Sequence, residues 1–224
     1  MAARASQNGM IEAPRGLRAD ARDNRERILK AAREVYATRG IDVPISVIAR
    51  RAGVGVATLY RRFPTRDSLV SEAFAEQFAE CAGVLDEALA DPDPWRGFCS
   101  LIEKVAEMQI ADRGFTAAFL SRLPAEPEHE RVRARAERDI GVLVRRAQQA
   151  GRLRPDFDPT DVFLLLRANF ALAEVAAPLS YAASRRLVAY LIQSFEAGQT
   201  KPLPPPAALG VRQIHESLVR GRGM

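Results

Sequence analysis

The sequence predicts an all-α protein with a small unit of short helices near its N-terminus and a larger helical bundle after it. Apolar residues recur at helical spacing through most of the 224 residues, and no segment shows convincing strand alternation. Glycine and proline divide the first 66 residues into short segments, whereas the later segments are longer. Together these patterns indicate about nine helices.

The first helix is expected from Asp20, which can cap it, to Gly40, which can end it. Apolar residues share one face of this segment, namely Ile28, Ala32, Val35 and Tyr36. Residues 1–19 are polar and aperiodic, and they are predicted to form a flexible basic arm. The second helix is expected near Pro44, because the missing N–H of proline costs little at the first helical position.

Residues 45–63 carry the most informative pattern. A short helix with an apolar face begins at Ile45 and runs into Gly53-Val54-Gly55. A second short segment, Val56 to Phe63, stops before Pro64. Two short helices joined by a glycine-containing turn of three or four residues form a helix-turn-helix, whose second helix enters the DNA major groove.

The charge distribution supports a polyanionic partner. Residues 15–70 hold 13 Lys and Arg against 6 Asp and Glu, whereas residues 71–224 hold 19 against 21. Because the basic end coincides with the helix-turn-helix, double-stranded DNA is the expected partner.

The rest of the chain is predicted to be helical. Thr65 can cap a long helix from Arg66 to Ala90, and Asp91-Pro92-Asp93-Pro94 breaks it. The segment Val162–Ala177 is apolar nearly all round, which requires burial on every side. The other expected helices carry the apolar stripes Phe98–Met108, Phe115–Leu120, Val132–Ala147 and Leu187–Phe195.

Several classes of protein are excluded. No apolar run approaches the roughly 18 residues of a membrane-spanning helix, and no signal-peptide core begins the chain, so a cytoplasmic protein is expected. Cys81 and Cys99 are interpreted as small core residues. His129 and His215 lie far apart, and no metal-ligand spacing, phosphate loop or nucleophile motif occurs. We therefore expect no enzyme activity, cofactor or metal.

The motifs between Asp20 and Phe78 closely resemble the TetR family of bacterial transcriptional regulators. The resemblance rests on RERILKAAREVYATRG, on Thr58-Leu59-Tyr60 after AGV, and on Phe63-Pro64 followed by Thr65-Arg66. The stretches WRGFCSLIEKVAEM and DFDPTDVFLLLRANF are similar to an SbtR-type C-terminal domain.

The resemblance implies a homodimer in which residues 20–66 bind DNA and residues 67–198 sense a ligand and dimerise. Residues 199–224 are expected to form a flexible tail. The implied function is that of a regulator, most often a repressor, that binds a near-palindromic operator and is released by an unidentified small-molecule effector. The alternative is a C-terminal half that only dimerises and has no effector.

The resemblance also implies roles for individual residues. Gly55, Val56 and Ala57 start the recognition helix, where side chains can contact base edges. Thr58 and Tyr60 occupy positions that hydrogen-bond phosphates. Arg61 occupies a position that contacts a base or a phosphate. Arg66 occupies a position that commonly binds a phosphate, together with the backbone N–H groups at the N-terminus of the next helix.

Two departures from the family pattern change these expectations. Gly55-Val56 replaces a polar Ser-Lys pair, so Val56 and Ala57 are expected to contact thymine methyl groups instead. Pro44 replaces a phosphate-binding Thr, for which Ser46 could substitute. Alternatives remain open for two residues. Tyr60 could be a half-buried aromatic that only packs, and Arg61 could be a solvated arginine without a DNA contact.

The resemblance implies a ligand cavity in the C-terminal half. Its predicted lining is Phe78, Trp95, Phe98, Ile102, Phe119, Leu143, Arg167 and Phe170. For each apolar residue the alternative is a filled core. Arg167 and Glu174 share one helix face and could form an internal network, or Arg167 or Asn169 could bind a polar group of a ligand. A four-helix dimer bundle would explain the apolar segment Val162–Ala177.

Overall fold

The computed structural model describes residues 15–121, 127–198 and 201–207, and most of these are helical, as predicted. They contain ten α-helices, one 3₁₀ turn and a single isolated bridge between Leu153 and Glu196. The all-α fold class is therefore confirmed. None of the described helices is long and apolar enough to cross a membrane.

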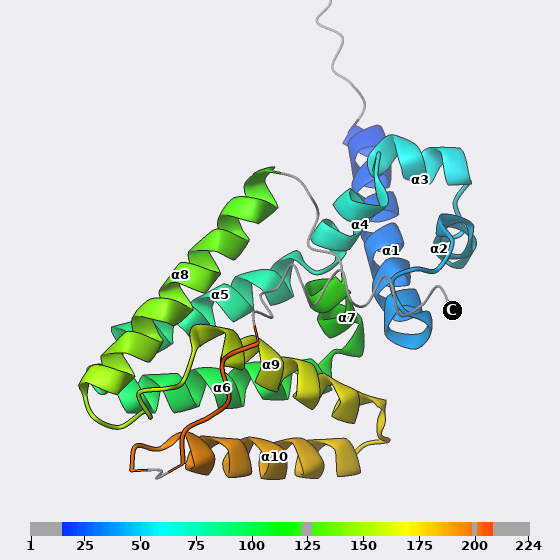
Figure 1. The fold of residues 1–224 in the computed structure, drawn as a ribbon. Coiled ribbons are helices and arrows are strands. Elements are labelled where there is room, and N and C mark those ends of the chain that lie inside the picture. The colour runs from blue at the N-terminus through cyan, green and yellow to red at the C-terminus, as the bar shows by residue number, and fades with distance from the viewer. Residues whose placement is uncertain (1–14, 122–126, 199–200, 208–224) are drawn as a thin grey trace, which may run out of the picture.

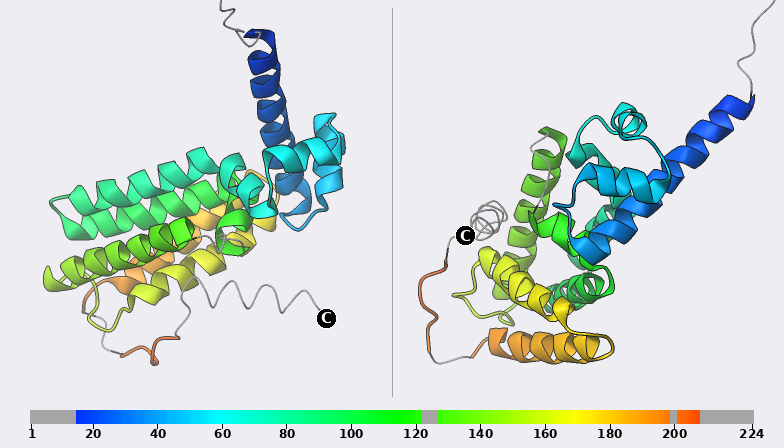
Figure 2. Two further views of the ribbon diagram at one scale, coloured as in Figure 1. Left: turned by 90° about the horizontal axis from the view of Figure 1, so that it is seen from above. Right: turned by 90° about the vertical axis from the view of Figure 1, so that its right-hand side faces the viewer.

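The N-terminal unit lies at one end of an elongated bundle (Figures 1 and 2). The first helix begins at Arg15 rather than at Asp20, so residues 15–19 of the predicted arm are helical. The helices of this unit are α1 (Arg15–Arg39), α2 (Ile45–Ala52), α3 (Val56–Arg62) and α4 (Arg66–Ala73).

The helix-turn-helix forms as the sequence predicts. Gly53 ends α2 in the left-handed conformation, with φ 68°, and its N–H donates to the carbonyls of Ala49 and Arg50. Gly55 caps α3, so the turn between the helices is three residues long. Pro44 occupies the N-cap position of α2, one residue before the helix.

The long helix predicted from Arg66 to Ala90 is wrong, because the chain breaks at Phe74. α4 ends at Ala73, and α5 (Ala75–Ala90) follows. Arg33 donates from Nη1 to the Ala73 carbonyl over 3.1 Å, and the fully buried Phe74 ring lies 6.1 Å from the Tyr36 ring. Contacts with α1 thus set the break, which no glycine or proline marks in the sequence.

The C-terminal bundle is built around α6, which contacts α5, α7, α8, α9 and α10 (Figure 1). Local capping explains where its helices begin. Asp93 accepts from the N–H groups of Trp95 and Arg96 at the start of α6, and Asp158 and Asp161 form a capping box on α9. The bounds are α6 (Pro94–Ala111), α7 (Arg113–Ser121), α8 (Pro127–Gln149), α9 (Pro159–Phe170) and α10 (Leu179–Phe195).

The single helix predicted over Val162–Ala177 is also wrong. α9 ends at Phe170, a 3₁₀ turn covers Ala171–Glu174, and the chain then reverses so that α10 runs back beside α9 (Figure 1). This segment is not buried on every side within one protomer, since 47% of Leu164 is exposed. The 3₁₀ turn ends the helix eight residues before Pro178, which occupies the N-cap position of α10.

Two apolar cores hold the molecule together. One joins α1 to α4 and includes Phe115 and Ala118 of α7, and the other joins α5, α6, α8, α9 and α10. α7 therefore packs with the DNA-binding unit, although its sequence follows the start of the bundle. Cys81 packs against both cores, and burial raises the pKa of its thiol to about 11, in agreement with an inert core residue.

Arg154 ties the loop between α8 and α9 to the described part of the C-terminal segment. Its guanidinium pairs with Asp156 and donates to the carbonyls of Ser194 and Lys201. Asp156 also accepts the N–H of Leu203, and the Arg154 guanidinium together with this N–H lowers the pKa of the Asp156 carboxyl to about 2. Residues 201–207 are thus fastened to the bundle, and the rest of the predicted tail lies outside the described residues.

Candidate DNA-binding surface and sensor core

The outer face of α3 is open to solvent. Val56 is 41% exposed and Tyr60 48% exposed, and Gly55 and Ala57 are exposed beside them. Thr58 is half-buried. Leu59 and Phe63 are fully buried and fix the helix on the N-terminal core. Val56 and Tyr60 lie one turn apart on α3, as do Ala57 and Arg61, so these predicted recognition residues are accessible on the outer side of the helix.

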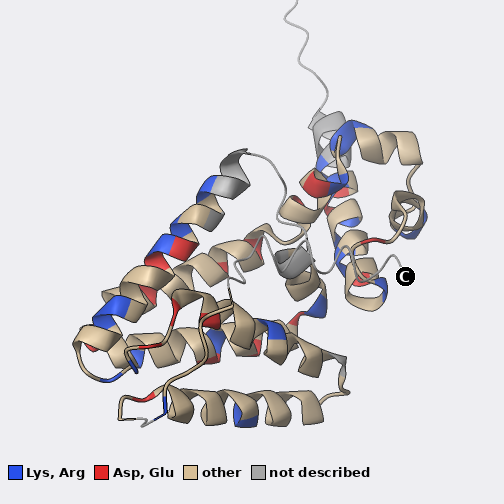
Figure 3. Cartoon of the chain, viewed as in Figure 1, with Lys and Arg blue, Asp and Glu red and all other residues tan. Residues whose placement is uncertain are grey.

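Arg61 and Arg62 extend this face. Both are exposed and make no hydrogen bond or ion pair with any residue that the structure describes. Both α1 and α8 carry charges of both signs (Figure 3). Unpaired arginines on an exposed recognition helix are suited to phosphate or base-edge contacts.

Other arginines of the unit are already engaged. Arg66 donates from Nη1 to the Ile41 carbonyl over 3.1 Å, so the predicted phosphate clamp is partly committed to the loop after α1. Arg51 donates to Glu34 Oε2 from Nε over 2.9 Å and from Nη2 over 2.7 Å, and these hydrogen bonds lower the pKa of the Glu34 carboxyl. Arg25 pairs with Glu72 and lies over the Phe63 ring. Sequence reasoning missed these partners because they come from distant segments.

Ser46 is exposed in the first turn of α2. No side chain caps that turn, although the Val47 N–H donates to the Pro44 carbonyl over 2.9 Å. This position suits a phosphate contact, as the sequence suggests.

Several of the predicted ligand-lining residues lie together in the core that joins α5, α6, α8, α9 and α10, which we call the sensor core after its predicted role. Trp95, Phe98, Ile102 and Leu143 are buried there. The Trp95 and Phe98 rings stack with their centroids 5.7 Å apart, and Phe98 meets Phe157 at 5.4 Å. Two aromatics that sequence reasoning did not include complete this cluster, namely Phe157 in the loop before α9 and Phe195 at the end of α10.

The remaining predicted lining residues are separated. Phe78 packs against the N-terminal core, where its ring lies 5.2 Å from Phe115. Phe170 packs on the edge of the sensor core, and the Arg167 guanidinium lies 5.9 Å from its ring centroid. The side chains of Phe119 and Glu174 lie outside the described residues. The predicted pairing of Arg167 with Glu174 therefore also lies outside them.

Asn169 belongs to a buried hydrogen-bond network. Its Nδ2 donates to the Ala106 carbonyl over 3.2 Å and to Gln109 Oε1 over 2.9 Å. Its Oδ1 accepts from Ser184 Oγ over 2.7 Å. Internal partners therefore occupy the Asn169 amide, for which a ligand contact was the sequence-based alternative.

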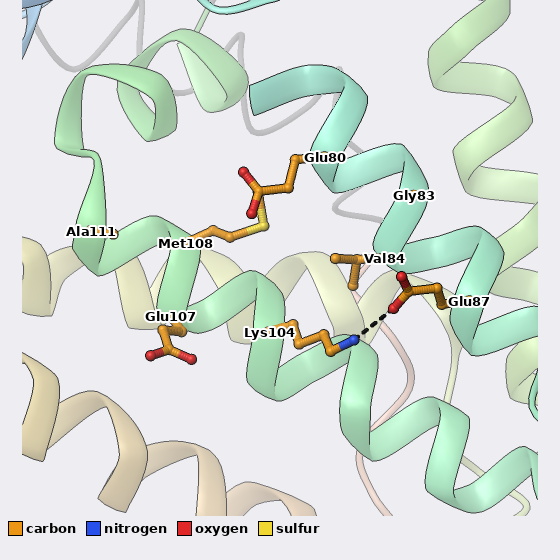
Figure 4. A pocket seen from close by; sticks show the side chains of 8 residues that line it. All are labelled: Glu80, Gly83, Val84, Glu87, Lys104, Glu107, Met108 and Ala111. Carbon is orange, nitrogen blue, oxygen red and sulfur yellow. Dashed lines mark hydrogen bonds and ion pairs between the residues drawn. The ribbon is translucent and has the colours of Figure 1, made fainter. Parts of the chain in front are cut away.

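Two hollows flank the outer side of α6. One, of about 510 Å³, lies between α5 and α6 and holds the 2.7 Å ion pair of Glu87 with Lys104 (Figure 4). The other, of about 490 Å³, lies between α6 and α10. Neither is lined by any of the eight residues predicted for the ligand cavity.

α9, the turn after it and α10 present an apolar surface. Its large residues are Leu164, Val175, Leu179 and Tyr190, which are 47%, 39%, 63% and 57% exposed. Arg186 donates to the Tyr190 hydroxyl over 2.6 Å and holds that ring on the surface. We call these four residues the α9–α10 face.

The junction between the halves is tightly packed at Gly114 on α7. A Cβ at this position would lie 3.1 Å from the Ala37 nitrogen on α1 and 3.2 Å from Phe74 Cζ. The Phe74 ring in turn lies 6.2 Å from Phe115. Only glycine allows α7 to approach α1 this closely without a shift of backbone.

Two family models match the chain. Residues 28–73 match the tetR family of bacterial regulatory proteins, and residues 93–193 match the C-terminal domain of SbtR-like transcriptional regulators. The protein is a TetR-family regulator. Its helix-turn-helix therefore belongs to a DNA-binding transcriptional regulator, and the predicted resemblance is confirmed for both halves.

Known relatives agree with this assignment. The regulator is 32% identical over 139 residues to the uncharacterised HTH-type transcriptional regulator Rv2250c of Mycobacterium tuberculosis, covering 60% of this chain and 72% of the relative. These relatives are regulators rather than enzymes. Among the described residues no group of His, Cys, Asp or Glu could hold a metal ion.

Solved structures share the fold. The ketosteroid transcriptional regulator KstR2 of Mycobacterium tuberculosis superposes with a TM-score of 0.61 at 17% identity, over 77% of this chain and 94% of that one. FadR of Bacillus subtilis, solved in complex with stearoyl-CoA, gives 0.55 at 16% identity, over 76% of this chain and 98% of that one.

Proposed function

We propose that this TetR-family regulator is a repressor that binds a near-palindromic operator as a homodimer and is released by a small-molecule effector. The observation that carries the proposal is the outer face of α3. It combines exposed Val56 and Ala57, which fit thymine methyl groups, with unpaired Arg61 beside them. Thr58, Tyr60 and the first turn of α2 at Ser46 then fix the helix on phosphates.

The α9–α10 face supports the dimer. An exposed apolar surface of this kind favours burial against a second copy, and a two-fold axis makes the same patch serve both protomers. Two antiparallel helices from each protomer would form a four-helix bundle. The two recognition helices would then read half-sites about 34 Å apart.

The fold relationship to FadR, which was solved with stearoyl-CoA, supports an effector. The coupling would pass through α7, which packs on α1 at Gly114 although it belongs in sequence to the sensing half. A ligand that prefers one arrangement of the bundle over another changes operator affinity, and such coupling is typically about 1–3 kcal/mol. The packed aromatic cluster around Phe98 favours the second candidate, a dimerisation scaffold without an effector.

Binding to the DNA flanking the regulator's own gene tests the proposal, with random duplex of equal length as the control. Selective binding by a dimer, with affinity that falls steeply as salt rises, is the expected result. Equal weak binding to both duplexes would contradict operator recognition at that site, and no binding at low salt would contradict DNA binding altogether.

A thermal-shift screen separates the two candidates for the C-terminal half. A ligand that binds only the folded protein raises its melting temperature in a saturable way. A saturable shift with concurrent loss of operator binding favours the effector. A C-terminal half that no compound stabilises favours the scaffold.

A further inference from the structure

The hollow between α6 and α10 has the dimensions of a small-molecule site. Its volume of about 490 Å³ falls within the range of roughly 300–1,000 Å³ that such sites occupy. We call it the α6–α10 cleft. Its lining comes from Glu103, Ala106, Glu107 and Ile110 on α6 and from Tyr181, Ser184, Arg185, Val188 and Ala189 on α10.

The floor of the cleft is mostly apolar. Ala106, Ile110 and Val188 are each less than a tenth exposed, and they present aliphatic surface between the two helices. A ligand with an apolar body can bury that body against them. Ser184, 3% exposed, supplies the one buried polar group of the floor.

The hydrogen bonds beneath the floor fix which way the Ser184 hydroxyl points. The Ala106 carbonyl can only accept, so the Asn169 atom 3.2 Å from it is the amide nitrogen. Asn169 Oδ1 then faces Ser184 Oγ at 2.7 Å, and Ser184 must donate. Because its proton is committed to Asn169, the hydroxyl can only accept from a molecule in the cleft.

The α6 wall adds two further acceptors. Glu103 and Glu107 are one turn apart and exposed, and neither makes a hydrogen bond or ion pair with a described residue. Ionised carboxylates only accept, and like charges at this spacing repel each other. Arg185 is the one cation in the lining, so the cleft carries an excess of negative charge.

A separate observation shows that the polar network is incomplete. Gln109 is 2% exposed, and its Nε2 has no hydrogen-bond partner among the described residues, although its Oε1 accepts from Asn169. Native cores leave few buried donors unsatisfied. Gln109 does not line the cleft, and its free amide N–H can only donate, so Glu103, Glu107 and Ser184 alone define what the cleft accepts.

The hollow between α5 and α6 differs from the α6–α10 cleft in its ion pair and in the absence of a buried hydroxyl from its lining. Its Glu87 already pairs with Lys104 at 2.7 Å, as Figure 4 shows. No buried hydroxyl or amide lines it. Glu107 lines both hollows, whereas Glu87 lines only the hollow between α5 and α6 and therefore provides a control position.

We infer that the α6–α10 cleft binds a small organic ammonium compound with an apolar body. The ammonium N–H groups donate to Glu103, Glu107 and Ser184, and the apolar body lies on Ile110 and Val188. The inference rests on the proposed function in one respect, that this cleft is the effector site. Other residues of α10, Leu179 and Tyr190, belong to the α9–α10 face, so an occupant of the cleft would contact a helix of the proposed dimer interface.

Isothermal titration calorimetry on the full-length protein at pH 7 tests the charge selectivity. The probes are 2-phenylethylamine, which is an ammonium ion at this pH, neutral 2-phenylethanol and anionic 3-phenylpropanoate, which are similar in size and shape. The amine is expected to bind at least tenfold more tightly than the alcohol, and the anion to show no saturable binding. Equal affinities, or no binding of the amine, would overturn the inference.

Three variants locate the site. The double variant Glu103→Gln/Glu107→Gln keeps the side-chain size, and it should weaken the amine at least tenfold while the alcohol stays within twofold. Glu87→Gln in the other hollow should change neither. Unaltered amine binding in the double variant, or an equal loss in Glu87→Gln, would place the amine outside the cleft.

Operator binding in the presence of the amine separates this inference from the proposed function. Release of the operator by the amine, lost in the double variant, supports the cleft as the effector site. Amine binding in the cleft without release removes only its effector role. A ligand-free protein that fails to select its operator contradicts the proposed function and leaves the binding site standing.

Discussion

Two exposed helix surfaces of this regulator differ in chemistry, and the difference indicates what each contacts. The outer face of α3 places small apolar side chains beside the unpaired guanidinium of Arg61. The α9–α10 face instead presents the exposed apolar side chains of Leu164 and Leu179 together with Tyr190, whose hydroxyl accepts from Arg186. A cationic surface gains from phosphates, whereas an apolar one gains by leaving water, so the first suits DNA and the second suits another protein chain.

The comparison also shows that charge alone does not define a DNA-binding surface. Arg51 and Arg61 lie in the same small unit, yet Arg51 is held by Glu34 and Arg61 is free of any described partner. The distinction depends on what α1 places beside each guanidinium. It predicts that exposed arginines of this unit contribute unequally to operator binding.

The largest expected effect follows from Leu164→Glu. Because Leu164 is 47% exposed in the protomer, the fold should survive, but a carboxylate buried unpaired in a dimer interface costs about 3–5 kcal/mol. Light scattering should therefore find a monomer. The matched control is Val142→Glu on α8, 38% exposed and away from the α9–α10 face, which should remain dimeric. A dimeric Leu164→Glu protein would remove this face from the interface.

Gly114→Ala should disturb the contact between α7 and α1, through which the two halves of the protein are proposed to be coupled. The added Cβ meets Ala37 and Phe74 at 3.1 and 3.2 Å, and overpacking of this kind typically costs about 1–3 kcal/mol. We expect a lower free energy of unfolding together with altered operator affinity. Gly83→Ala on α5 is the control, since nothing lies within 4 Å of its Cβ and alanine favours a helix. If both variants behave alike, the close approach of α7 to α1 has no role in coupling.

Arg61→Ala should cost about 1–3 kcal/mol of operator binding if the guanidinium contacts a base, and specificity should relax at one position. Affinity for a set of operators, each with one altered base pair, measures this directly. A uniform loss across that set would assign Arg61 to phosphate, and no loss would remove it from the interface.

Tyr60→Phe removes one exposed hydroxyl and keeps the ring, so a loss of about 1 kcal/mol is expected. The loss should be the same for every sequence, because a phosphate contact carries no base information. Parallel titrations of operator and random duplex check it. A sequence-selective loss would contradict the phosphate role.

Arg51→Ala should have the smallest effect. Its guanidinium is engaged by Glu34 and is not available to DNA, so operator affinity should stay within about twofold and its salt dependence should not change. A loss similar to that of Arg61→Ala would show that the ion pair opens on DNA and that the two arginines are equivalent.

Local signals in the sequence predicted much of the fold and of the DNA-binding surface. Gly53 marks the end of α2 because only glycine adopts its left-handed conformation readily, and Thr65 starts α4 because its hydroxyl accepts the N–H of Ser68 at 2.9 Å. Both act within four residues. The break at Phe74 gives no such signal, because the partner that stabilises it is Arg33 on another helix.

The sensing half was less predictable for the same reason. The apolar stripes identified its helices, but they could not distinguish a filled core from a cavity, and the Phe98 ring turns out to pack on Phe157 and Phe195. Asn169 was recognised as unusual from its apolar surroundings. Its partners, Gln109 and Ser184, come from two other helices and could not be named in advance.

The sequence by itself determined the helical fold class, the helix-turn-helix, the basic N-terminal unit and the family, because periodicity, capping and turn residues act over a few positions along the chain. The tertiary structure alone decided that Arg51 is paired while Arg61 has no partner among the described residues, that α7 packs on α1, and that α6 and α10 enclose a cleft with acceptor groups. These properties depend on contacts between residues far apart in sequence, which no local pattern encodes.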